Sequence, residues 1–196
     1  MRNLFLTLGL TLALIAPSFA QKSVVSDCYL SFNDATGLTK DKTDRLPEGF
    51  ERQRAVPTAA GDVMVSRSDG YRVLYNNPKN VPFVNLKIER SEDGQYEEDQ
   101  KKLMDNIRYF SQLEGHTFQK LEFNGYAIYG SSRTSIEKGS FLGTFVMFPG
   151  DGVAVYFYLQ NLRAGYRHFE TTEEYERLRD TFIEEYTRHL KKCMGK

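Results

Sequence analysis

Runs of alternating or continuous apolar residues mark the β-strands expected in the central part of the chain. These runs are 63–65, 71–75, 84–88, 120–123, 126–129, 141–148 and 153–159. Turn-forming residues separate several of them, at Ser68-Asp69-Gly70, Asn124-Gly125 and Pro149-Gly150-Asp151-Gly152. Such residues favour hairpins because they adopt the backbone angles of tight turns at low cost. The pattern therefore predicts a hairpin over 63–75, a separate strand over 84–88 and an antiparallel meander from 120 to 159.

Two segments have the 3.6-residue periodicity of amphipathic helices. The first, at about 96–113, places apolar residues three or four positions apart on one face and charged residues on the other. The second, at about 172–192, carries a similar apolar stripe. Thr171 and Glu174 precede that stripe with the spacing of an N-terminal capping box, so we expect the last helix to begin there.

The strands over 141–148 and 153–159 do not alternate in the usual way, because both of their faces are apolar or aromatic. A strand of this kind is covered on both sides. The sequence therefore predicts an α+β fold in which an antiparallel sheet, a meander, is covered by helices on both faces as a three-layer sandwich. We expect a single α+β domain over 61–196, preceded over 21–60 by an irregular N-terminal arm, which is polar and rich in turn-forming residues.

The first twenty residues have the features of an export signal peptide. Arg2 gives a positive start, an apolar run follows over 4–15, and Ser18-Phe19-Ala20 has the small-x-small pattern of a cleavage site. This run is too short to span a bilayer, which needs about 20 residues. No later segment is long and apolar enough to span, so we expect a secreted mature chain without a transmembrane segment. The absence of any Asn-x-Ser/Thr site favours the bacterial periplasm.

The charge balance argues against a general affinity for polyanions. The chain has 26 Lys and Arg against 26 Asp and Glu, which gives a formal net charge of zero. Nucleic acids and anionic membranes attract proteins chiefly through an excess of positive charge. We therefore expect no nucleic-acid partner.

Export would place the two cysteines, Cys28 and Cys193, in a compartment where a disulfide persists. They lie near opposite ends of the exported chain, so a bridge between them would close nearly the whole domain into one loop. The alternative is a reactive or metal-binding thiol assisted by His189, one helical turn before Cys193. Two scattered cysteines do not make a structural zinc site, so the disulfide is the prediction.

The sequence contains no complete catalytic or cofactor-binding motif. His116, His168 and His189 are dispersed and do not have the HExxH spacing. The segment 139–143 lacks the Gly-x-Ser-x-Gly spacing of a nucleophile elbow, and the acidic residues over 92–99 lack the alternating oxygen ligands of a calcium loop. We therefore expect no catalytic residues, no metal and no cofactor.

The segment 160–169 combines cationic and aromatic residues between the most apolar strand and the last helix. Its candidate partner-binding residues are Arg163, Tyr166, Arg167, His168 and Phe169. Such a mixture can bind an anionic or aromatic group, and loops carry binding functions more often than the scaffold does. The alternative is an ordinary connector whose aromatic residues pack beneath it.

Three features occur in a set order along the chain. They are the hairpin Phe123-Asn124-Gly125-Tyr126, an aromatic strand after Asp151-Gly152, and a closing helix with Tyr175-x-x-Leu178-x-x-x-Phe182. Over about Val63 to Leu190 this order resembles the PsbP-like family of exported domains. The resemblance implies an antiparallel sheet between helical layers and a non-enzymatic accessory or binding role. The chain lacks the tryptophan often found near that family's first strand and adds a long arm with Cys28, so no site residue is carried over.

Three functions follow from these observations as hypotheses. The first is an exported non-catalytic binding or accessory module whose partner, a protein or a small molecule, is unknown. The second is a carrier of a small hydrophobic ligand or lipid, with a START-like cavity between the last helix and a curved sheet. The third is a hydrolase that uses His116 or His168 with a nearby carboxylate, which requires these groups to meet in the fold. The oligomeric state is left open.

Overall fold

The computed structural model describes residues 24–33, 37–46, 53–77, 82–136, 141–160, 162–163, 166–167 and 169–195, with the backbone alone for 82, 162–163 and 166–167. In chain order the elements are η1 (Asp27–Tyr29), β1 (Thr39–Arg45), β2 (Gln53–Thr58), β3 (Gly61–Ser66), β4 (Asp69–Asn76), β5 (Pro82–Arg90), α1 (Tyr96–Ser111), β6 (His116–Phe123), β7 (Tyr126–Arg133), β8 (Phe141–Gly150), β9 (Val153–Gln160), β10 (Leu162–Arg163), β11 (Tyr166–Arg167) and α2 (Thr172–Cys193). The predicted export signal, residues 1–20, lies outside the described residues. Within the described part of the chain, no helix is long and apolar enough to cross a membrane.

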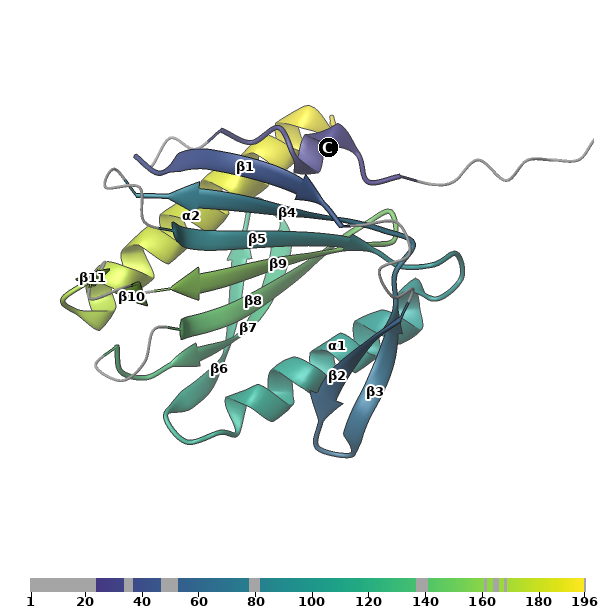
Figure 1. The fold of residues 1–196 in the computed structure, drawn as a ribbon, viewed down its shortest axis with the longest axis horizontal. Coiled ribbons are helices and arrows are strands. Elements are labelled where there is room, and N and C mark those ends of the chain that lie inside the picture. Colours follow the sequence, from purple (N-terminus) through teal and green to yellow (C-terminus); the bar gives the residue numbers. More distant parts are fainter. Residues whose placement is uncertain are drawn as a thin grey trace, which may run out of the picture.

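Seven strands form one sheet in the order β1-β4-β5-β9-β8-β7-β6, and all neighbouring strands are antiparallel (Figure 1). The predicted α+β fold and its meander are confirmed, since β6 to β9 follow one another in the sheet. At two of the turns Asn124 and Asp151 have φ angles of 54° and 55°, and each is followed by a glycine at positive φ. Asn, Asp and Gly tolerate this left-handed region better than other residues. The turn sequences therefore specify where these hairpins reverse.

One face of the sheet packs against α2. Phe157 of β9 and Phe182 and Tyr186 of α2 are completely buried in one large apolar cluster. The rings of Phe157 and Tyr186 meet edge to face with centroids 5.5 Å apart. The hydroxyl of Thr171 caps the helix by accepting a hydrogen bond from the backbone N–H of Glu174 at 3.1 Å. The predicted start of the last helix is therefore confirmed.

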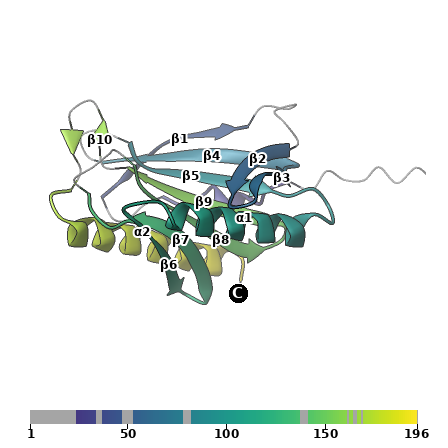
Figure 2. The same ribbon diagram turned by 90° about the horizontal axis from the view of Figure 1, so that it is seen from below.

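The opposite face packs against α1 and the hairpin formed by β2 and β3 (Figure 2). Leu103 and Ile107 of α1 share a second buried cluster with Tyr156 of β9 and with apolar residues of both hairpin strands. The carboxylate of Asp99 on α1 accepts a hydrogen bond from the backbone N–H of Ser66 on β3 at 3.0 Å. Strand β9 is apolar on both sides because its residues contribute alternately to the two clusters.

The prediction that 21–60 is an irregular arm is wrong, because β1 and β2 lie within it. Strand β1 is an edge strand of the sheet and pairs with β4, and six of its seven residues are exposed. A strand in this position is held mainly by backbone hydrogen bonds, so it needs no apolar face. Its sequence therefore lacks the alternation by which a strand is recognised.

The predicted hairpin over 63–75 is also wrong. Strand β3 pairs with β2, and β4 pairs with β1 and β5 in the main sheet. Asp69 lies inside β4 instead of in a turn, and it is only 6% exposed. Its carboxylate accepts hydrogen bonds from the backbone N–H of Val25 at 3.0 Å and from Nε of Arg45 at 3.2 Å. Asp69 thus ties two N-terminal segments to the sheet.

The predicted disulfide between Cys28 and Cys193 is confirmed, with the two Cα atoms 5.7 Å apart across a sequence separation of 165 residues. The segment that it fixes belongs to the core. The ring of Phe32 meets that of Tyr186 edge to face at 5.4 Å, and the Tyr186 hydroxyl donates to the carbonyl oxygen of Tyr29 at 3.1 Å. The disulfide and these contacts together join the N-terminal segment to the last helix.

Candidate functional site

The segment predicted to bind a partner is described only in part. The backbones of 162–163 and 166–167 pair as β10 and β11, but the side chains of Arg163, Tyr166 and Arg167, and all of His168, lie outside the described residues. Phe169 is 2% exposed and packs edge to face on two other buried rings, with centroids 5.1 and 5.7 Å away. Its assignment to a binding surface is corrected, because a side chain this deeply buried is a core residue.

The two described histidines lie in different elements and have different partners. His116 begins β6, and its Nδ1 lies 3.1 Å from the carbonyl oxygen of Glu114. Nε2 of His189 lies 3.1 Å from Oγ of Ser31 and 3.2 Å from the carbonyl oxygen of Cys28, so this histidine helps to hold the N-terminal segment. Among the described residues no group of three or more His, Cys, Asp and Glu is placed to hold a metal ion.

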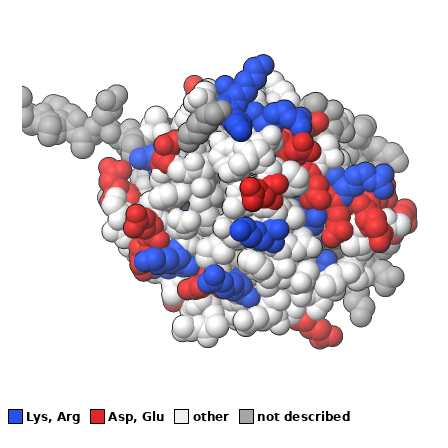
Figure 3. Space-filling model, turned by 180° about the vertical axis from the view of Figure 1, so that it is seen from behind, with Lys and Arg blue, Asp and Glu red and all other residues white. Residues whose placement is uncertain are grey.

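The molecular face opposite the view of Figure 1 carries acidic and basic side chains together (Figure 3). Such a mixture does not define a binding surface for either sign of charge. A hollow of about 440 Å³ lies beside the β6–β7 turn and is lined in part by Gly125, Tyr126, Pro149 and Lys191. It is more open and more polar than a second cavity of the molecule.

The second cavity, here called the α1 pocket, has a volume of about 400 Å³ and lies between α1, β2 and the sheet. Its apolar walls include Val56 of β2, Phe110 of α1, Leu113 just beyond α1, and Phe141 of β8. This volume is typical of pockets that enclose small molecules. Its polar wall residues come from α1, β2 and the strands β6 to β9, so the pocket is formed by segments that are distant in the sequence.

A buried ionic cluster lies behind one wall of the α1 pocket. The carboxylate of Glu89 on β5 contacts Arg54 at 2.9 Å, Arg67 at 2.8 Å and Lys87 at 2.8 Å, and the side chain of Glu89 is 6% exposed. Burial opposes ionisation of Glu89, but Arg54, Lys87 and Arg67 outweigh it and lower its pKa to about 2. Burial also lowers the pKa of Lys87. Glu89 is therefore a fixed negative charge shared by three cations.

Two stacked tyrosines of β9 connect this cluster to the α1 pocket. The guanidinium of Arg54 lies over the ring of Tyr156 at 5.5 Å, and its NH2 group donates to the Tyr156 hydroxyl at 3.0 Å. The rings of Tyr156 and Tyr158 are 6.0 Å apart and nearly parallel. Burial raises the pKa of Tyr156 well above its usual value and that of Tyr158 to about 12. Both phenols are therefore neutral at physiological pH.

Two buried polar atoms of the pocket wall have no hydrogen-bond partner among the described residues. They are Nε of Arg54 and Oγ of Ser131, and Ser131 is only 3% exposed. A buried polar group without a partner costs roughly 1–3 kcal/mol, so native proteins contain few of them. Both side chains line the α1 pocket, and that of Arg54 is 24% exposed, so its guanidinium is the charged group that a ligand there would meet.

Exposed apolar side chains are concentrated at the same place. Leu113, Phe118 and Phe141 are about two-fifths exposed, and we call these three residues the apolar rim. Leu113 and Phe141 line the α1 pocket, and Phe118 on β6 pairs with Ser131 across the strands. Large apolar residues grouped on a surface often indicate a binding site.

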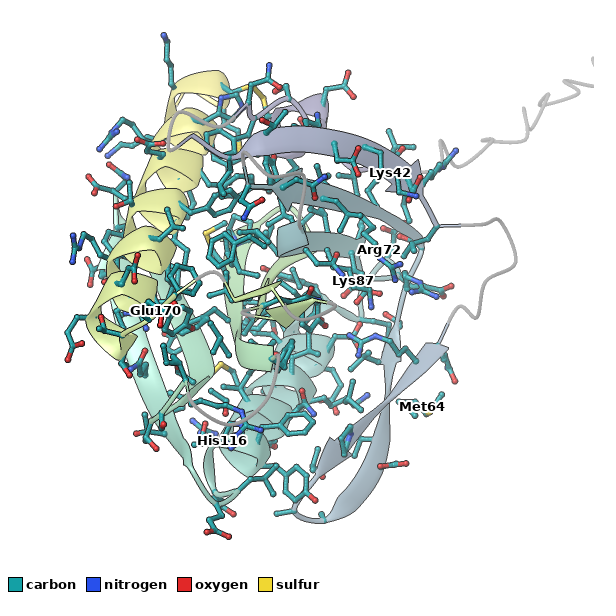
Figure 4. The ribbon with its side chains drawn as sticks, turned by 60° about the vertical axis from the view of Figure 1, so that its left-hand side comes forward. Lys42, Met64, Arg72, Lys87, His116 and Glu170 are labelled. Atoms are coloured by element: carbon teal, nitrogen blue, oxygen red, sulfur yellow. A yellow bond between two sulfur atoms is a disulfide. The ribbon has the colours of Figure 1, made fainter. Side chains whose placement is uncertain are left out.

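The ionisable side chains among the described lining residues of the α1 pocket are Arg54, His116, Tyr156 and Tyr158. His116 lies in its wall, but none of the described lining residues is an aspartate or a glutamate. Figure 4 shows Lys42, Arg72 and Lys87 following one another across β1, β4 and β5, with His116 toward the far edge of the sheet. The described lining therefore offers one guanidinium, one imidazole and several hydroxyl groups to a ligand.

Apart from His116, which the hydrolase hypothesis names, the residues of this site were not among the candidates predicted from the sequence. Arg54 lies in the segment that was expected to be irregular, and Tyr156 lies in a strand whose aromatic residues are typical of a core. One sequence feature could have indicated the buried ionic cluster. Strand β5 lies inside the sheet, yet it carries the charged residues Lys87 and Glu89 between apolar ones. Charged residues at such positions are rare unless they are paired.

Comparison of the chain with protein-family models, curated proteins and solved structures finds no match. The resemblance to the PsbP-like family therefore stays a prediction. The function has to be inferred from the site.

Proposed function

We propose that the protein is an exported, non-catalytic binding module that takes up a small, largely apolar molecule in the α1 pocket. The observation that carries the proposal is the pocket itself, a cavity of about 400 Å³ with the apolar rim at its edge. Of the partners considered from the sequence, a small molecule fits such a cavity better than a protein does.

The proposed site differs from a START-like cavity beneath the last helix. The side chains of α2 that face the sheet, among them Tyr175, Phe182, Ile183, Tyr186 and Leu190, are completely buried against it. Interiors packed in this way have no room for a ligand. We therefore place the ligand on the α1 side of the sheet.

We also propose that the protein is exported to the periplasm and that its fold is a three-layer sandwich of the PsbP-like kind. The Cys28–Cys193 disulfide supports export to the periplasm, because disulfides persist in oxidising compartments. The packing of α1 and α2 against opposite faces of the sheet supports a three-layer sandwich of the PsbP-like kind.

The proposal is tested with aminoanthracene, a neutral fluorescent probe whose emission rises in apolar surroundings. We expect saturable binding with one site per chain. Thr144 lines the pocket between Ser131 and Tyr158 on the neighbouring strands, so Thr144→Phe should fill the pocket and abolish binding. The matched control is Thr117→Phe at an exposed position of β6. Absence of probe binding, or equal binding by the Thr144→Phe variant, would refute the proposal.

A further inference from the structure

The first observation is that Arg54 shares its carboxylate partner, Glu89, with two other cations. Its NH2 group divides its contacts between Oε2 of Glu89 and the hydroxyl of Tyr156. Glu89 also binds Arg67 and Lys87, so Arg54 has only a share of one carboxylate. The charge of a guanidinium that is three-quarters buried is only partly neutralised by such sharing.

The second observation is that Arg54 and Ser131 line the pocket and that the Arg54 side chain is still 24% exposed. Nε of Arg54 is a donor at all accessible pH values, and the hydroxyl of Ser131 can also donate. Both atoms are buried without a hydrogen-bond partner among the described residues, and both side chains line the α1 pocket. The exposed part of the Arg54 guanidinium can donate to an oxygen acceptor in the pocket, and a guanidinium binds a negatively charged oxygen most strongly.

The third observation is that most of the remaining lining residues are apolar or aromatic, and the other polar ones are Asn106, His116 and Thr144. Phe110 and Leu113 approach from α1 and the residues just after it, and Phe141 and Tyr158 approach from the sheet, with their ring centroids 6.2 Å apart. Arg54 is the only arginine or lysine among the described lining residues. One guanidinium matches a single negative charge, as a carboxylate carries, better than the two charges of a phosphate monoester.

We propose that the ligand of the α1 pocket is an amphipathic monoanion, with an acidic oxygen group bound at Arg54 and an apolar or aromatic body held by Phe110, Leu113 and Phe141. This inference rests on the proposed function and adds the chemical class of the ligand. An aromatic or short aliphatic carboxylic acid satisfies both parts of the pocket.

The test compares two molecules of nearly the same shape, naphthalene carboxylate and the neutral naphthalene carboxamide, by displacement of aminoanthracene at pH 7. We expect the carboxylate to bind about tenfold or more tightly than the amide, because a hydrogen bond to a charged group is the stronger one. This comparison uses the unmodified protein, so it does not depend on how any variant folds.

Two variants then test whether Arg54 causes the preference for the carboxylate over the amide. Arg54→Gln removes the cation but leaves Arg67 and Lys87 on Glu89, and we expect it to bind acid and amide with affinities equal within about twofold. The matched control is Arg108→Gln on α1, where the side chain is 62% exposed and contacts Asp105, and it should keep the preference for the acid.

The outcomes separate the two proposals. Equal binding of acid and amide by the unmodified protein, or a preference that survives Arg54→Gln, overturns the assignment of the ligand class while the pocket remains a binding site. If aminoanthracene does not bind at all, the proposed function fails, and the ligand class fails with it.

Discussion

The stabilisation that ionised Glu89 gives to the folded protein can be tested quantitatively through its pH dependence. Its pKa is about 2 in the folded protein against an ordinary value of 4.5. One pKa unit corresponds to about 1.4 kcal/mol, so ionised Glu89 stabilises the folded state by about 3 kcal/mol at neutral pH. Because the folded-state pKa is the lower one, this stabilisation is present above about pH 4.5 and is lost as the pH falls towards 2. About 2 kcal/mol of it should be gone by pH 3.

The perturbation is Glu89→Gln, which removes the carboxylate and leaves the cations of the cluster buried. We expect the free energy of unfolding to fall by about 3 kcal/mol or more at pH 7, as found when one partner of a buried ion pair is removed. The difference between the unmodified protein and the variant should then shrink by about 2 kcal/mol between pH 7 and pH 3.

The measurement is urea unfolding followed by circular dichroism, because the chain has no tryptophan. Glu122→Gln, at an exposed position of β6, is the matched control and should change stability by no more than about 0.5 kcal/mol. A loss below about 1 kcal/mol for Glu89→Gln at pH 7, or a difference that stays constant down to pH 3, would show that the cluster does not stabilise the protein as argued.

Three further predictions concern the disulfide and the sheet. Replacing Cys28 and Cys193 together by serine should lower the free energy of unfolding by up to about 5 kcal/mol, measured by urea unfolding, because a loop this long gains much entropy in the unfolded chain; an unchanged midpoint would contradict this. Gly130→Ala should cost about 1–3 kcal/mol in the same assay, since a Cβ atom there would overlap the buried ring of Phe145, and a neutral effect would show that the sheet can adjust to the added methyl group. Ser131→Ala should leave the melting temperature unchanged or raise it, because it removes a buried hydroxyl without a partner; a drop of several degrees would mean that this hydroxyl is already satisfied.

The central strands and both helices could be predicted from the sequence because their local signals agree with their tertiary environment. Asn124 and Asp151 mark turns whose backbone angles few other residues accept, and Thr171 marks the start of α2. The edge strand β1 gives no such signal, since Thr39–Arg45 is exposed and polar. The pairing of β3 was mistaken because Asp69, a residue typical of turns, serves here as a buried anchor.

The candidate site could not be predicted because it depends on contacts between distant segments. Arg54 meets Glu89 across 35 residues and Tyr156 across 102. Neither the charge nor the ring is unusual in its own segment, and only the packing of β2 over the sheet brings them together. Local periodicity indicates which side of a strand is buried, but it does not indicate which distant residue packs against that side.

The Cys28–Cys193 bridge also determines how the domain would carry mechanical load. A tensile force applied to the chain outside the two cysteines would pass through the covalent S–S bond. It would not be carried by the chain between them, which spans a sequence separation of 165 residues. Every strand of the sheet lies within that closed loop, and so do all the described residues that line the α1 pocket. Pulling on the ends would therefore leave the α1 pocket free of mechanical load.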